Sequence, residues 1–200
     1  MRDFNLRIRK YKLLTGILLC HWLLPGEPAL AATLERPDDD MRQALVEAIS
    51  SSDSFGDRFA AEVWLTDMLN RLGSRVTDPE EAVSILKTAH YEALRARIQP
   101  ELVLAIMDVE SNFDRFAISS AGAQGLMQVM PFWLEEIGRP HDNLMDIGTN
   151  LRFGCTILSL YLKREDGNMR RALARYNGSV GEHWYPNRVF NALRKRWYPQ

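Results

Sequence analysis

The clearest sign of a helical fold is the stretch Pro100-Glu101-Leu102-Val103-Leu104-Ala105-Ile106-Met107-Asp108-Val109-Glu110-Ser111. Glu110 shares one helical face with the core-type residues at positions 103, 106 and 107. A carboxylate on an apolar face is destabilising unless it is paired or neutral. Burial raises the pKa of a glutamate towards the range in which it can donate a proton at neutral pH. Glu110 is therefore the first candidate for a general acid.

A stretch of small residues begins nine positions after Glu110. It runs Ser119-Ser120-Ala121-Gly122-Ala123-Gln124-Gly125-Leu126-Met127-Gln128-Val129-Met130-Pro131. Gly122 and Gly125 allow a positive φ or a close approach of the backbone to another group. A proton donor beside a loop that lines a cleft is therefore the first functional hypothesis.

Helical periodicity continues on both sides of this stretch, whereas strand signals are weak. Asp78-Pro79-Glu80-Glu81 is typical of a helix start, with a capping Asp, a first-turn Pro and two acidic residues. We expect an all-α protein with about eight helices. The expected helices span 41–50, 57–72, 78–98, 100–110, 131–137, 146–167 or 149–167, 168–176 and a last helix that begins at Pro186.

The composition is that of an ordinary globular protein. The chain has 200 residues, 46% of them hydrophobic and 26% charged, which is enough for one domain with a core. We expect one folded unit, because no Pro/Gly/Ser linker interrupts it. Residues 38–73 form a helical extension that either packs against the core or docks a partner protein.

The first 31 residues have the pattern of a secretory signal peptide. A basic start, an apolar run from Leu13 to Leu24 and an Ala29-Leu30-Ala31 cleavage pattern follow in order. The run is too short to cross a bilayer comfortably, so we expect cleavage, no integral membrane segment afterwards, and a periplasmic or secreted protein. An uncleaved anchor is the alternative. Ile17-Leu18-Leu19 does not resemble a lipobox, which argues against a lipid on Cys20.

Charge and ligand-type residues exclude several classes. Residues 1–31 hold five of the 25 Lys/Arg and two of the 26 Asp/Glu, so the remainder has a net charge of −4. That is not a basic nucleic-acid-binding protein. Cys155 lies at helical spacing with leucines and is expected to be a buried hydrophobe. His90 is expected to be a core or surface residue, and no metal or cofactor motif is present.

Four short segments follow one another in the second half of the chain. They are Glu110-Ser111, Gly125-Leu126-Met127-Gln128-Val129-Met130-Pro131, Leu173-Ala174-Arg175-Tyr176-Asn177-Gly178 and Tyr185-Pro186-Asn187-Arg188-Val189. In this order they resemble the SLT-type lytic transglycosylases, which share the lysozyme-like fold with goose-type lysozyme. The resemblance covers about residues 98–197. It implies a catalytic domain at 78–200 behind an N-terminal helical extension at 32–77. The third segment lacks the second Ala of the family's Ala-Tyr-Asn-Ala-Gly.

The resemblance implies cleavage of the β-1,4 bond between N-acetylmuramic acid and N-acetylglucosamine in peptidoglycan glycan strands. Most glycosidases use two carboxylates, whereas the resemblance implies only Glu110. Glu110 would protonate the leaving oxygen while the substrate's N-acetyl group stabilises the cationic centre. Glu110 would then act as base on the C6 hydroxyl, which closes a 1,6-anhydro ring without water.

The same resemblance implies substrate-binding roles for Ser119, Met127, Gln128, Tyr176, Asn177 and Tyr185. Ser119 matches a serine near the acid and the N-acetyl group, and Gln128 matches a cleft residue that hydrogen-bonds the substrate. Met127 would line the sugar subsites. Turn formation by Ser119 and core packing by Met127 are the alternatives.

Three further roles come from the third and fourth segments. Tyr176 matches a tyrosine whose hydroxyl reaches the glutamate region, and Asn177 would bind the N-acetyl carbonyl. Tyr185 matches the tyrosine of the fourth segment. Tyr176 and Asn177 have a structural alternative, in which they end a helix with Asn177 in the left-handed conformation.

Other functions stay open at this point. A lysozyme-type hydrolase needs a second carboxylate, and the candidates are Asp114, Glu135, Glu136, Asp142 and Asp146. A non-catalytic peptidoglycan-binding protein would leave Glu110 as a helix-end acid. The tryptophans at 133, 184 and 197 either stack on sugar rings or pack in the core.

Overall fold

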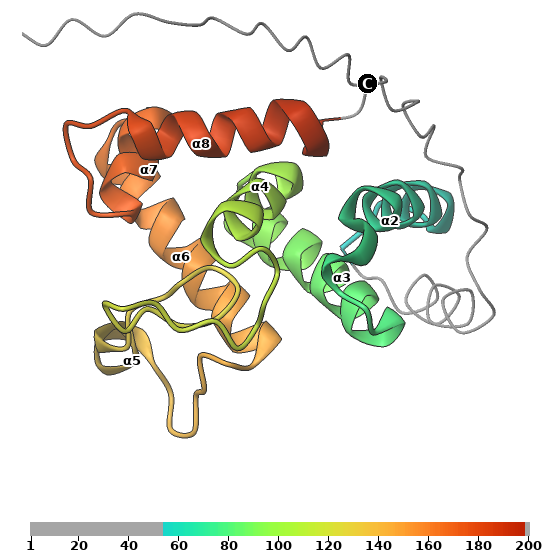
Figure 1. The fold of residues 1–200 in the computed structure, drawn as a ribbon, viewed down its shortest axis with the longest axis horizontal. Coiled ribbons are helices and arrows are strands. Elements are labelled where there is room, and N and C mark those ends of the chain that lie inside the picture. The colour runs from blue at the N-terminus through green and yellow to red at the C-terminus, as the bar shows by residue number, and fades with distance from the viewer. Residues whose placement is uncertain (1–53, 199–200) are drawn as a thin grey trace, which may run out of the picture. The chain divides into compact units, whose positions relative to one another are not determined.

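The computed structural model describes residues 54–198, which fold into helices joined by turns and loops (Figure 1). The helices are α2 (Arg58–Leu72), α3 (Pro79–Arg95), α4 (Pro100–Glu110), α5 (Phe132–Ile137), α6 (Ile147–Arg164), α7 (Met169–Tyr176) and α8 (Trp184–Ala192), with the short turns η1 (Gly73–Arg75) and η2 (Leu193–Trp197). Within this range no strand forms. Isolated bridges pair Ile118 with Gln124 and Gln124 with Val129. The expected all-α class is confirmed.

Two predictions lie outside the described residues. These are the signal peptide at 1–31 and the helix expected at 41–50. Among the helices from α2 onwards, none combines the length and the apolar character needed to cross a membrane.

Side-chain caps set the starts of α2, α3, α6 and α7. Asp78 accepts a hydrogen bond from the Glu80 backbone N–H at 2.9 Å and begins α3. Asp146 accepts from the Thr149 N–H at 2.8 Å, so it is Asp146 and not Thr149 that begins α6. Such caps satisfy backbone donors that have no partner inside the helix.

The last helix departs from its predicted start. α8 begins at Trp184, two residues before Pro186. Proline is tolerated in the first helical turn, because the N–H that it lacks would have no partner there. The helix then widens into the π-helical turn η2.

α4 is the centre of the core. Its residues from Leu102 to Met107 are all buried, and the helix packs against α3, α8 and η2. Figure 1 shows α4 between α8 and α3. α3 also packs on α6, α6 on α7, and α7 on α8. This arrangement brings α7 and α8 to the part of the molecule that contains the end of α4.

α2 packs against the same unit. It contacts α3 and η2, and the Trp64 indole N–H donates to Glu101 Oε1 at 2.8 Å. Arg71 Nη1 donates to the carbonyl oxygens of Arg196 at 2.7 Å and Tyr198 at 2.8 Å. Residues 58–72 therefore take the packing role, one of the two roles that the sequence allowed for this stretch.

Candidate active site

Glu110 is the last residue of α4, and its side chain is partly buried. The residues at 103, 106 and 107 have no exposed surface, as the helical spacing predicted. Tyr185, in the first turn of α8, donates its hydroxyl hydrogen to Glu110 Oε1 at 2.5 Å. The two residues are 75 positions apart in the sequence. The pair therefore forms only because α8 packs on α4.

The surroundings of Glu110 raise the pKa of its carboxyl group. Burial raises the pKa of its carboxyl above the ordinary value, while the hydrogen bond from Tyr185 and the charge of Arg188 act in the opposite direction. The raised pKa agrees with the direction predicted from the apolar helical face. A carboxyl group with a raised pKa keeps its proton to a higher pH, as a general acid requires.

Arg188 is a site residue to which the sequence analysis assigned no role. It lies on α8 three residues after Tyr185, and its charge acts on Glu110. Residues three apart lie on neighbouring positions of a helix surface. That spacing within the fourth segment is the signal that could have identified Arg188.

Two polar side chains hold the loop between α4 and α5. Ser111 Oγ donates to the Leu126 carbonyl oxygen at 2.8 Å, which joins the end of α4 to the loop. Asn150, buried on α6, accepts from the Met127 N–H at 2.8 Å and donates to two further backbone carbonyls. Asn150 was not predicted as a site residue. The sequence feature that could have identified it is a polar amide directly before Leu151 on a buried face of α6.

Glycines let the loop approach α6 closely. Gly125 has a φ of +74°, and an added Cβ would lie 2.3 Å from Asn150 Nδ2. On α6, a Cβ at Gly154 would lie 2.3 Å from Met127 Sδ. Gly122 has a φ of +85° with nothing near a Cβ. Gly125 is therefore required for space and conformation, and Gly122 for conformation alone.

Met127 lies in the core. Its side chain has no exposed surface, so in this conformation it presents nothing to a sugar. Its carbonyl oxygen accepts a hydrogen bond from Tyr176 Oη at 2.7 Å. Burial raises the pKa of Tyr176, and the charge of Glu110 acts in the same direction. The Tyr176 hydroxyl therefore lies within electrostatic reach of Glu110.

Gln128 supports the loop with its amide nitrogen. It is partly buried and has a φ of +47°, which few non-glycine residues adopt. Nε2 donates to the carbonyl oxygens of Ala117 at 3.1 Å and Gly125 at 3.0 Å. Both amide hydrogens are then used, so the amide oxygen is the group with which Gln128 can accept from a ligand.

Ser119 and Asn177 lie on surface turns. Ser119 Oγ accepts from the Ala123 N–H at 3.0 Å, so this side chain supports a turn. Asn177 is exposed after α7 and has a φ of −82°. The left-handed residue is Gly178, with a φ of +80°. The left-handed conformation considered for Asn177 is therefore wrong, because the glycine adopts it without steric conflict.

No hydrogen bond or ion pair within residues 54–198 joins Glu110 to a second carboxylate. Asp142 pairs with Arg152 at 2.6 Å, Asp146 caps α6 and Asp114 accepts from the Phe116 N–H at 2.8 Å. The two remaining candidates, at positions 135 and 136, are exposed on α5.

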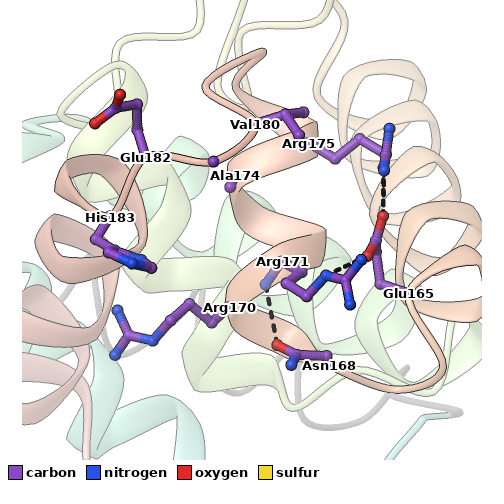
Figure 2. Close-up of a pocket in the computed structure, with 10 residues that line it drawn as sticks. Glu165, Asn168, Arg170, Arg171, Ala174, Arg175, Val180, Glu182 and His183 are labelled. Atoms are coloured by element: carbon purple, nitrogen blue, oxygen red, sulfur yellow. Dashed lines mark hydrogen bonds and ion pairs between the residues drawn. The ribbon is translucent and has the colours of Figure 1, made fainter.

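A different acidic residue, Glu165, is buried where α6 ends against α7 (Figure 2). Arg175 Nε donates to its Oε1 at 2.7 Å, and Arg175 Nη2 donates to the same oxygen. Arg171 Nε lies 2.7 Å from Oε2. These contacts hold α7 against α6 and so help to position Tyr176, the neighbour of Arg175. The adjacent cavity of about 420 Å³ is not lined by Glu110.

Two other titratable side chains are structural. The His90 ring stacks on Phe55 with ring centres 3.7 Å apart, and burial lowers its pKa to about 4. Cys155 is completely buried, as expected, and burial raises the pKa of its thiol. Within residues 54–198, no group of three or more His, Cys, Asp or Glu side chains is arranged to hold a metal ion.

Comparisons with known proteins identify relatives of this chain. A 39-residue stretch is 56% identical to membrane-bound lytic murein transglycosylase C of Actinobacillus pleuropneumoniae serotype 5b (strain L20), covering 20% of this chain and 11% of that protein. The protein of the same name from Yersinia pestis (strain Pestoides F) is 31% identical over 118 residues, covering 51% of this chain and 33% of that protein. The chain thus spans a third or less of these curated relatives.

Among solved structures, lytic transglycosylase Slt from Pseudomonas aeruginosa, in an inactive mutant form, matches with a TM-score of 0.44 and 21% identity. The match covers 70% of this chain and 30% of that one. The family model described as "Transglycosylase SLT domain" matches residues 87–196. The resemblance drawn from the four segments is thereby confirmed. Because the match covers more than half of the 200 residues, this chain belongs to the transglycosylase SLT domain family.

Proposed function

We propose that this chain is a peptidoglycan lytic transglycosylase in which Glu110 acts first as acid and then as base. The bond cleaved is the β-1,4 linkage between N-acetylmuramic acid and N-acetylglucosamine, and the product carries a 1,6-anhydromuramic end. The observation that carries this proposal is the state of Glu110. It is a partly buried carboxyl group with a raised pKa, held by a tyrosine and not by a second carboxylate.

In the first step Glu110 donates a proton. Tyr185 donates to Oε1, so the proton of the neutral acid resides on Oε2 and faces the substrate. The bond between C1 and the bridging oxygen breaks, its electron pair stays on that oxygen, and Oε2 supplies the proton. The carbonyl oxygen of the substrate's N-acetyl group stabilises the cation at C1. Tyr185 and Arg188 stabilise the carboxylate that remains.

In the second step Glu110 recovers its proton. The C6 hydroxyl oxygen attacks C1, and its hydrogen passes to Glu110 Oε2. A C1–O6 bond replaces the glycosidic bond, so no water is consumed and the enzyme returns to its starting state. A hydrolase would need a base to activate water, usually a second carboxylate. No such group contacts Glu110 within residues 54–198.

The remaining site residues have supporting parts in this proposal. Gln128 offers its amide oxygen to a substrate N–H or hydroxyl, and Asn177 offers an exposed amide. Tyr176 fixes the loop through the Met127 carbonyl. Ser119 shapes the turn and retains its hydroxyl hydrogen for a ligand. Met127 takes part through its backbone in this conformation.

Analysis of the products tests the reaction. Purified sacculi are digested with the enzyme, and the released muropeptides are separated and weighed by mass spectrometry. We expect anhydromuramic ends, lighter by one water than reducing ends, and far slower release of them by Glu110→Gln. Reducing muramic ends from the wild-type enzyme would establish a hydrolase, and equal turnover by the variant would remove Glu110 from its role.

We also propose that the chain is exported to the periplasm or secreted, because peptidoglycan lies outside the cytoplasm. The support is the basic start, apolar run and Ala29-Leu30-Ala31 pattern. N-terminal sequencing of the extracytoplasmic protein is expected to begin at Ala32. Recovery of the uncleaved chain in the membrane fraction would favour an anchor.

A further inference from the structure

Trp184 differs from the other tryptophans in the described part of the chain. Its side chain is 51% exposed at the start of α8. Trp197 is completely buried and donates to Asp108, Trp133 packs edge-on against Tyr161, and Trp64 donates to Glu101. Packing therefore accounts for three of these indoles and leaves the exposed surface of Trp184 without a structural explanation.

Trp184 contacts the tyrosine that holds the Glu110 carboxyl group. Its ring centre is 5.8 Å from that of Tyr185, and the ring planes are 83° apart. Tyr185 in turn donates to Glu110. Arg188 follows Trp184 by four residues, so the two share one face of α8, and the charge of Arg188 acts on Glu110. The start of α8 thus carries a hydroxyl that bonds Glu110, a charge that acts on Glu110, and an exposed indole that packs against the tyrosine ring.

The lining of the cavity beside Glu165 ends at His183, the residue before Trp184. His183 lines that cavity together with Arg170 and Glu182, as Figure 2 shows. Trp184, Tyr185 and Glu110 do not line it. The exposed indole therefore lies outside this cavity.

We propose that Trp184 is a saccharide-stacking residue that binds an N-acetylhexosamine ring next to the cleavage point. This inference rests on the proposed function. The C–H face of such a sugar is apolar, and a flat aromatic side chain gives a large contact area with little loss of conformational freedom. The edge-on contact with Tyr185 fixes the plane of the indole before the substrate arrives, which favours binding.

Binding without turnover is the direct test. The probe is a β-1,4-linked N-acetylglucosamine oligomer, titrated by calorimetry into Glu110→Gln and into double variants at Trp184. Adding Trp184→Ala is expected to weaken binding about tenfold. Trp184→Phe keeps a flat ring and should bind within about threefold of Glu110→Gln. Trp184→Leu keeps apolar bulk without a flat ring and should weaken binding as alanine does.

The outcomes separate this inference from the function on which it rests. Equal affinity of the Trp184→Leu double variant and Glu110→Gln overturns the stacking role alone. If Glu110→Gln with Trp184 intact binds no oligomer, the proposed substrate class fails, and the stacking role with it.

Kinetics then distinguish substrate binding from support of Tyr185. In the enzyme with Glu110 intact, Trp184→Ala should raise KM about tenfold and leave kcat and the alkaline limb of the pH profile unchanged. A shift of that limb would show that Trp184 acts through Tyr185 and overturn the inference. The matched control is Phe59→Ala, because Phe59 is also an exposed aromatic residue, 75% exposed on α2. The KM of this variant should equal that of wild type.

Discussion

Glu110 and Glu165 lie at the ends of α4 and α6, yet their environments shift their pKa values in opposite directions. Glu165 is 5% exposed, and the hydrogen bond from Arg175 lowers its pKa against the effect of burial. Glu110 is less deeply buried, and burial raises its pKa against a tyrosine hydroxyl and a nearby arginine charge. Glu165 has two ion-paired arginines. The described structure shows no ion pair at Glu110.

The comparison shows that partners, more than exposure, decide whether a glutamate in this fold is charged. A buried carboxylate surrounded by guanidinium groups remains ionised and joins two helices. At Glu110 burial outweighs the single hydrogen bond from a neutral hydroxyl, so the pKa of the carboxyl group is raised. The first arrangement serves packing, and the second is the one that our proposal uses for proton transfer.

The largest expected effect separates the two glutamates by activity. Glu110→Gln cannot donate or accept the proton, so the rate of anhydromuropeptide release should fall by about 10²–10⁴-fold. Glu165→Gln should retain measurable turnover at a temperature where it is folded. Release is followed by chromatography of digested sacculi. Equal losses of activity in Glu110→Gln and Glu165→Gln would mean that the environment of Glu110 has no special part in the activity.

The next effect concerns stability. Glu165→Gln leaves Arg171 and Arg175 without their charged partner and should lower the midpoint of thermal unfolding at neutral pH. Because the pKa of Glu165 is lowered, the ionised carboxylate stabilises the folded protein at pH values above the ordinary glutamate range. This stabilisation is lost as pH falls through the lowered pKa. The difference in unfolding midpoint between wild type and Glu165→Gln should therefore become smaller at acidic pH. The control is Glu182→Gln, because Glu182 is an exposed residue that lines the same cavity. Its unfolding midpoint should equal that of wild type.

A third prediction concerns the tyrosine that holds Glu110. The hydrogen bond from Tyr185 opposes the rise of the Glu110 pKa, so Tyr185→Phe should move the alkaline limb of the pH–rate profile to higher pH. The variant also loses a bond to the carboxylate formed during reaction, and kcat should fall about tenfold. Tyr176→Phe removes a bond to the Met127 carbonyl instead and should leave that limb in place. A downward shift in Tyr185→Phe would contradict the geometry.

The smallest expected effect is the stability of Glu110→Gln. A raised folded-state pKa means that the carboxyl group favours folding below the ordinary glutamate range and loses this contribution as pH rises through the raised value. The variant should therefore unfold at a temperature of the order of 2 °C above wild type at neutral pH. Below the ordinary glutamate pKa the difference should vanish. Calorimetric scans across the acid range measure it, and a less stable variant at neutral pH would refute it.

Much of the site could be inferred from local pattern. The helical spacing of α4 placed Glu110 on a buried face, and the order of four segments indicated the family. Tyr176 and Tyr185 were named from those segments, although their hydrogen-bond partners were not. No role was predicted for Arg188 or Asn150. The sequence shows that one carries a charge and the other an amide, but it does not show which distant group each contacts in the fold.

Some expectations failed for local reasons that only coordinates reveal. α8 begins before Pro186, because the first turn of a helix needs no N–H from that residue. The left-handed position after α7 falls on Gly178 and not on Asn177. Met127 lies wholly in the core, next to Gly154, where an added Cβ would be 2.3 Å from its sulfur.

The sequence by itself determined the all-α class, the cap at Asp78, the family and the choice of Glu110 as candidate acid. These depend on interactions within a few residues and on segment order, both of which are present in the linear chain. Only the tertiary structure decided what surrounds that acid. Tyr185 reaches Glu110 across 75 positions, and Trp184 stays exposed beside Tyr185. Both features depend on how α8 packs on α4. Burial and hydrogen bonding shift the pKa of Glu110, and both arise only when segments distant in the sequence pack together.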